Sequence, residues 1–151
     1  IQFGMNDCNY WADDQNLPRV SPNSFVANLE EIVERAIAFG VRHCFLNTNH
    51  PSLKGSFSHY SGITYDDSNA RYNQLIRDAH ERMTATGKPV TLIDMEKIWL
   101  DQLAHPAATK LENLLLEDGI HLSEEGHALY TNHLIPKVIE KLIEISELEA
   151  D

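Results

Sequence analysis

Short apolar runs alternate with amphipathic stretches along this chain. The apolar runs are IQF at 1–3, VRHCFLN at 41–47 and PVTLIDM at 89–95. A strand of a parallel sheet is buried on both faces and is apolar throughout, whereas a helix that covers it is apolar on one face only. The alternation therefore predicts an α/β fold with a parallel sheet.

The amphipathic stretches carry the end signals of helices. Ser21 and Pro22 are suited to begin the first helix, and Gly40 to end it. The second stretch ends at Gly87, and a shorter helical piece is expected at 96–103. The candidate N-caps of the second helix are Asp66, Asp67 and Ser68.

The last helix is expected to begin just after His121, with Ser123 as its N-cap. Pro136 lies inside this helix and should kink it or divide it into two segments. The apolar positions that we expect to be buried are Leu129, Leu134, Val138, Leu142 and Ile145.

The composition excludes several partners. A net charge of −11 disfavours nucleic acid, whose phosphates require a basic face, and also an anionic membrane surface. No apolar run approaches the roughly 18 residues that cross a bilayer, so no membrane span is expected. Two cysteines do not make a disulfide framework, and Cys44 is expected to be a buried thiol. The cellular compartment is undetermined.

The chain opens with Ile1 inside a predicted strand, and three strands are few for a sheet with helices on both faces. We therefore expect residues 1–151 to form a single domain whose N-terminal strands are missing. The edge of the first strand would then favour self-association. The loop from 49 to 64 leaves the carboxyl end of a predicted strand, where ligands bind in open α/β sheets.

The sequence DGIHLSEEGH at 118–127 places a carboxylate close to an imidazole. Gly119 allows a tight turn, so Asp118 can hold one ring nitrogen of His121 and leave the other free as a base. The alternative is a polar loop that only organises the helix after it.

The sequence IQFGMND at 1–7 places Asn6 just after a predicted strand. There its side-chain amide can donate to charge that develops on a carbonyl oxygen, as in an oxyanion hole. Gly4 would keep the backbone close to a bound substrate, and Asp7 would accept hydrogen bonds from loop amides. The alternative is an ordinary Asn-Asp turn.

The two motifs together resemble the SGNH hydrolases, also called the GDSL esterase/lipase family. Its G-x-N-D block is matched at 4–7 and its D-x-x-H block at 118–121, and EEGH at 124–127 is typical of its members. The resemblance covers essentially the whole chain. It implies a three-layer α/β/α sandwich, with Asp118 and His121 as acid and base of a Ser-His-Asp triad and Asn6 as an oxyanion donor.

The nucleophile of that family lies in a G-D-S block, which this sequence does not contain. Ser56 and Ser58 lie in a mid-chain loop and lack the strand-to-helix setting of a nucleophile. The 151-residue chain alone is therefore expected to be inactive, with the serine supplied by sequence outside it. A thiol hydrolase that uses Cys8 would instead require His121 within reach.

Two aromatic residues, Tyr10 and Trp11, follow the Asn6 motif. They are suited either to line a substrate pocket or to cap the hydrophobic core. The remaining histidines show neither an HExxH motif nor a Cys/His ligand spacing, so no metal and no cofactor is expected.

The sequence thus predicts a carboxylic ester hydrolase for a small-molecule, lipid or sugar ester. The alternative is a non-catalytic α/β module that has lost its nucleophile and only binds a ligand or a partner.

Overall fold

The computed structural model describes residues 1–10, 15–55, 62–105 and 109–148. Within this part the sheet consists of two strands, which pair in parallel with Cys44 opposite Val90 and Asn47 opposite Ile93. Helices and parallel strands alternate, which confirms the α/β class. The elements in chain order are α1 (Pro22–Ala38), β1 (Cys44–Asn47), α2 (Tyr65–Ala85), β2 (Val90–Ile93), α3 (Met95–Leu103), α4 (Leu111–Leu114) and α5 (Glu124–Leu148).

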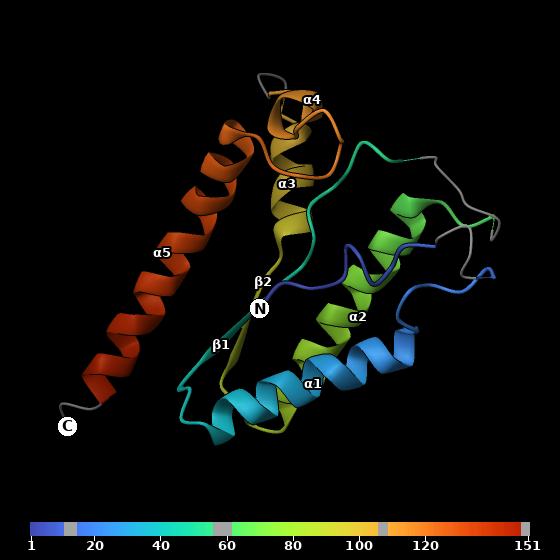
Figure 1. The fold of residues 1–151 in the computed structure, drawn as a ribbon. Coiled ribbons are helices and arrows are strands. Elements are labelled where there is room, and N and C mark those ends of the chain that lie inside the picture. The colour runs from blue at the N-terminus through green and yellow to red at the C-terminus, as the bar shows by residue number, and fades with distance from the viewer. Residues whose placement is uncertain (11–14, 56–61, 106–108, 149–151) are drawn as a thin grey trace.

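Helices lie on both sides of the strands. Figure 1 shows α1 and α2 side by side on one side of β1 and β2, and α5 on the other. Side chains of β1 alternate between the two sides, as the pleat of a strand requires. Cys44 and Leu46 pack into the core formed with α1 and α2. Phe45 packs against a second core, formed by α3, α4 and α5 around Trp99.

Local capping signals predicted some helix ends correctly. The Ser21 hydroxyl accepts from the backbone N–H of Ser24, and Pro22 is the first residue of α1. The start of α2 was predicted too late, because Thr64 is the cap and Tyr65 the first helical residue. The first turns of α2 bury polar residues such as Ser68, so hydrophobic periodicity did not reveal them.

Of the two effects expected of Pro136, a kink or a division of the helix, the division does not occur, because α5 passes through Pro136 as one element. Proline leaves the carbonyl four residues earlier, that of Asn132, without its helical partner. Both residues are exposed, and water can satisfy this carbonyl. The short helix α4 was not predicted, because four residues are too few to show a period.

The predicted strand at 1–3 is not formed as a strand. The α-amino group of Ile1 donates to the Phe45 carbonyl at 2.7 Å, and the Ile1 carbonyl accepts from the Asn47 N–H at 3.0 Å. A strand is a run of paired residues, and here only Ile1 pairs with β1. Phe3 is 51% exposed. None of the described helices has the length and apolar character that a membrane crossing requires.

Candidate active site

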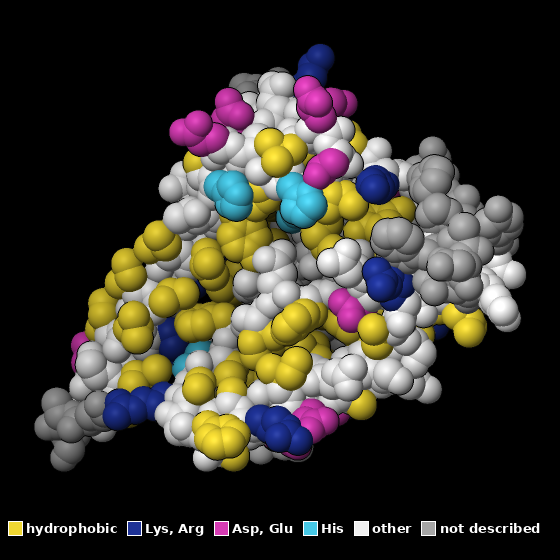
Figure 2. Space-filling view, viewed as in Figure 1, with side chains coloured by type: hydrophobic (Ala, Val, Ile, Leu, Met, Phe, Trp, Pro, Cys, Tyr) yellow, Lys and Arg dark blue, Asp and Glu magenta, His cyan; other side chains and the backbone are white. Residues whose placement is uncertain are grey.

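A cleft of about 690 Å³ lies at the carboxyl ends of β1 and β2. Figure 2 shows histidine side chains at the rim of a hollow that hydrophobic side chains line. Three separate segments form the cleft: the N-terminal turn, the loop after β1, and the turn before α5 together with the first turn of that helix. The lining residues are Gln2, Phe3, Gly4, Met5, Asn6, Asp7, Asn49, His50, Leu116, Ile120, His121, Leu122 and His127.

A tight turn presents His121 to this cleft and holds Asp118 against its ring. Leu115 and Leu122 form an antiparallel bridge at its base, and the carbonyl of His121 accepts from the Leu116 N–H at 2.7 Å. Gly119 adopts a φ of +70°, and a Cβ there would lie 2.8 Å from the Leu53 Cβ. The turn therefore requires glycine at this position.

The Asp118 carboxylate holds His121 through both of its oxygens. Oδ2 lies 2.5 Å from the ring Nδ1, and Oδ1 accepts from the backbone N–H groups of Ile120 and His121, both at 2.9 Å. A carboxylate only accepts, so Nδ1 carries the proton and Nε2 is left free. The bond from the His121 ring and those from the backbone hold the Asp118 pKa well below its ordinary value. The carboxylate is therefore ionised at neutral pH.

The start of α5 fixes this turn from the other side. The Ser123 hydroxyl accepts from the Gly126 N–H at 3.1 Å, which confirms Ser123 as the predicted cap. It also donates to the Asn113 carbonyl at 2.6 Å. A Cβ at Gly126 would lie 2.1 Å from the Leu114 carbonyl oxygen. The glycine of the EEGH motif thus lets α5 begin in direct backbone contact with α4.

The N-terminal turn places Asn6 in the same cleft as His121. The Asp7 carboxylate accepts from the Gly4 N–H at 3.0 Å, so Asp7 is a structural acceptor as predicted. Gly4 has a φ of +124°, and a Cβ there would lie 2.5 Å from the Asn49 Nδ2. Gly4 therefore makes room for a neighbouring side chain, a reason for glycine that the sequence did not show.

Two buried asparagines of α2 hold the loop after β1. The Asn73 carboxamide accepts from the Asn49 N–H at 2.7 Å and donates to the Asn49 carbonyl at 3.0 Å. Asn69 donates to the His50 carbonyl at 3.2 Å. Sequence reasoning missed these four residues. The available signals were two asparagines four residues apart on the buried face of a helix, and an Asn-His pair after a predicted strand.

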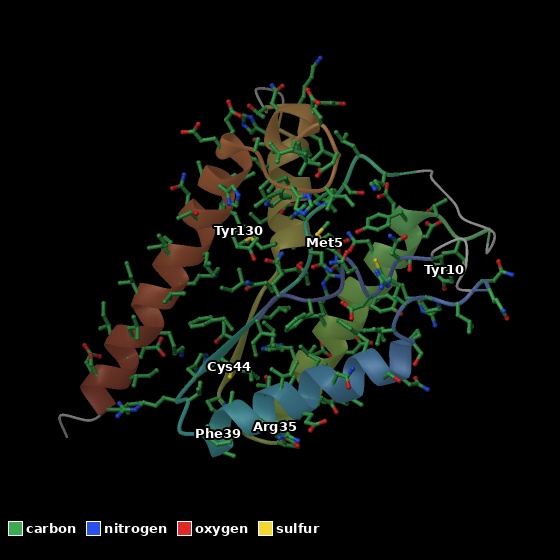
Figure 3. All side chains as sticks on the ribbon, in the orientation of Figure 1. Met5, Tyr10, Arg35, Phe39, Cys44 and Tyr130 are labelled. Carbon is green, nitrogen blue, oxygen red and sulfur yellow. The ribbon has the colours of Figure 1, made fainter. Side chains whose placement is uncertain are left out.

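Tyr10 does not line this cleft. It is buried and bridges to Pro18, and Figure 3 shows it beside the start of α2, whereas Met5 lies near the centre of the molecule. Of the two interpretations of Tyr10, the structure favours core packing. Trp11, Ser56 and Ser58 lie outside the described residues.

The interpretation of Cys8 as a nucleophile is not supported. Its side chain is fully buried in the core beside α2, and its thiol donates to the Met5 carbonyl at 3.4 Å. Burial raises the Cys8 pKa to about 12, which removes the thiolate that attack requires. Cys44 is a buried thiol, as predicted.

A histidine oriented by a carboxylate, beside an asparagine at the carboxyl end of a parallel sheet, is an arrangement suited to acyl hydrolases. The model of the GDSL-like lipase/acylhydrolase family matches residues 1–129. The chain therefore belongs to this family, the SGNH hydrolases, and membership implies a hydrolase of the esterase type. No curated protein and no solved structure matches the chain.

Proposed function

We propose that this chain carries the acid and the base of a serine esterase whose nucleophile is supplied by sequence outside the 151 residues. His121 Nε2 takes the proton of the serine hydroxyl, which attacks the ester carbonyl, and Asp118 stabilises the imidazolium that forms. The Asn6 amide donates to the oxyanion. His121 then returns the proton to the leaving alcohol, and water releases the acid from the acyl-enzyme.

The contact between Asp118 and His121 carries this proposal. Three hydrogen bonds fix the carboxylate, and the ring nitrogen that it leaves free belongs to a residue of the same cleft as Asn6. A polar loop that only organised α5 would not need this arrangement, because Ser123 already caps the helix. The complete domain is proposed to be a three-layer α/β/α sandwich with strands beyond β1 and β2.

The hydrolysis of p-nitrophenyl acetate tests the proposal in two forms of the protein. The 151-residue chain should show neither a burst nor turnover above its His121→Ala variant. The protein expressed from its complete gene should turn over, and His121→Ala should lower its kcat by about 10⁴-fold or more. Asn6→Ala should cost about 10²–10³-fold in rate.

Three outcomes would contradict parts of this proposal. Hydrolysis by the 151-residue chain that disappears in His121→Ala would place a nucleophile within it. A near-normal rate in Asn6→Ala would remove the oxyanion role. If the complete gene encodes no G-D-S segment and its product is inactive, the non-catalytic binding module is the better interpretation.

A further inference from the structure

The His50 side chain has a fixed orientation and one free ring nitrogen. Its ring stacks on Trp99 with centroids 5.0 Å apart, and only 4% of the residue is exposed. The ring Nδ1 lies 2.8 Å from the Pro51 carbonyl. A carbonyl only accepts, so Nδ1 carries the proton, and Nε2 has a lone pair for a donor. Burial lowers the His50 pKa, with a smaller effect from the proximity of His121, which keeps this lone pair available.

The neighbouring Asn49 has a carboxamide without partners. Its side chain is fully buried, yet neither Nδ2 nor Oδ1 forms a hydrogen bond within the described part of the chain. Buried polar side chains are nearly always hydrogen-bonded, and leaving one unpaired costs free energy. The backbone of Asn49 is fully satisfied by Asn73, so the unpaired groups are confined to the side chain.

Both residues line the cleft that contains Asn6 and His121. His50 Nε2 is an acceptor for a ligand in this cleft. The unpaired amide of Asn49, a donor, lies fully buried directly behind the cleft wall. A hydroxyl group is complementary to this pair, because it donates one hydrogen bond and accepts others. An alkyl group would leave both polar residues unpaired, and such a site rejects analogues that lack the hydroxyl.

We propose that Asn49 and His50 form a subsite for a hydroxyl group of the substrate. His50 Nε2 accepts from the hydroxyl, and the Asn49 amide donates to its oxygen. The substrate class is then an ester of a hydroxylated compound, such as a sugar or polyol, and not a plain alkyl ester. The identification of the ligand as a substrate rests on the proposed function. The binding of a hydroxyl group at this site can be tested without hydrolysis.

The test is an NMR titration of the protein expressed from its complete gene with two probes that contain no ester. Methyl glucoside and tetrahydropyran share a six-membered ring, but only the first carries hydroxyl groups. Methyl glucoside should bind more tightly and should shift the Nε2 resonance of His50. The loss of one neutral hydrogen bond should weaken methyl glucoside binding by roughly 3- to 10-fold in His50→Phe, which keeps an aromatic ring on Trp99.

The variant Asn49→Leu separates binding from a structural role. Its amide has no protein partner among the described residues, so leucine, which has the same branched shape, should leave thermal stability unchanged or higher while methyl glucoside binding falls. Thr48→Val is the matched control. Thr48 is fully buried one residue earlier, donates to Asp94 at 2.9 Å and does not line the cleft. The Thr48→Val variant should be less stable than the wild type but should still bind methyl glucoside more tightly than tetrahydropyran.

Equal affinity for the two probes, no binding of either, or a preference that survives in both His50→Phe and Asn49→Leu would overturn the subsite. An Asn49→Leu chain that is strongly destabilised would also count against it, because the amide would then have a structural partner. Binding of methyl glucoside by a protein that never hydrolyses an ester would refute the proposed function and leave the hydroxyl site standing.

Discussion

Asp118 is held by three hydrogen bonds, and its ionisation therefore contributes to folding. The bond from His121 is the largest cause of the lowered pKa of this carboxyl, and the backbone N–H groups add to it. A carboxyl whose folded pKa lies below its unfolded value stabilises the fold above the unfolded pKa. This contribution is lost as the pH falls through the folded pKa.

The variant Asp118→Asn should remove this contribution. The difference in free energy of unfolding between wild type and variant should be present at pH 5 and should shrink as the pH is lowered toward 2. Urea unfolding at several pH values measures it. Asp101→Asn is the control, since Asp101 is exposed and, within the described part of the chain, pairs only with Lys97 on its own helix. A difference that does not change with pH would contradict the role of the ionised carboxylate.

Gly4 is constrained both by its backbone and by a neighbour. Gly4→Ala places a Cβ 2.5 Å from the Asn49 Nδ2 at a φ of +124°, and should lower the free energy of unfolding by about 1–3 kcal/mol. Gly40→Ala is a matched control, with a φ of +89° but open space around the Cβ. Thermal unfolding should show a larger loss of stability for Gly4→Ala than for Gly40→Ala. Equal losses would mean that the Asn49 side chain can move away from the new Cβ without cost.

Among single residues, the contact between Asp118 and His121 could be predicted because it is local. Three residues and a glycine turn suffice to bring the groups together. The contacts of Asn49 could not be predicted in this way. They depend on Gly4 and Asn73, which are distant in sequence and meet only through the fold.

The helix α2 supports the site as well as the core. One of its faces buries Tyr72 and Ile76 beside two asparagines, Asn69 and Asn73. The side-chain amides of Asn69 and Asn73 form hydrogen bonds with the backbone of the loop after β1, in place of the water that this backbone loses when it is buried. The loop can therefore be buried at the carboxyl end of the sheet without unsatisfied backbone groups.

The variant Asn73→Ala should destabilise the fold strongly. It leaves the N–H and the carbonyl of Asn49 buried and unpaired, which should cost about 2–4 kcal/mol in the free energy of unfolding. Gln74→Ala, at an exposed position next to it, breaks only a hydrogen bond to Asp78 on the same helix and should cost less than about 0.5 kcal/mol. Similar losses in the two variants would contradict the supporting role of Asn73.

Among the elements, those with local signals were predicted best. Ser21 and Ser123 cap helices as expected, because capping involves only residues two or three positions away. The segment at 1–3 was predicted as a strand from its apolar character. A strand forms only where several successive residues pair with a neighbouring strand, and apolar character alone does not provide that pairing. Only Ile1 pairs with β1.

The molecule as a whole has an incompletely covered apolar surface. The backbone N–H and carbonyl of Gln2, next to the paired Ile1, have no partner within the described residues. Phe3 beside it is 51% exposed, and Ile139 and Leu142 on α5 are 51% and 60% exposed. An open edge next to apolar side chains is a site for strand pairing between chains.

The 151-residue chain is therefore expected to self-associate through this edge. Sedimentation velocity over a range of concentrations should show dimers or larger species. Phe3→Lys should reduce them, because a charge beside the unpaired backbone of Gln2 opposes pairing with another chain. The exposed apolar residues of α5 are unchanged in this variant, so any reduction in self-association can be assigned to the segment around Gln2 and Phe3. A monodisperse monomer at all concentrations would contradict the expectation.

Labelling with a fluorophosphonate, which reacts with the activated serine of serine hydrolases, tests the proposed esterase most directly. The protein from the complete gene should form a covalent adduct on one serine outside the 151 residues, and His121→Ala should abolish it. Peptide mass mapping locates the adduct. An adduct on a serine within the 151 residues, equal labelling in His121→Ala, or no labelling at all would contradict the assignment of His121 as the base for an external serine.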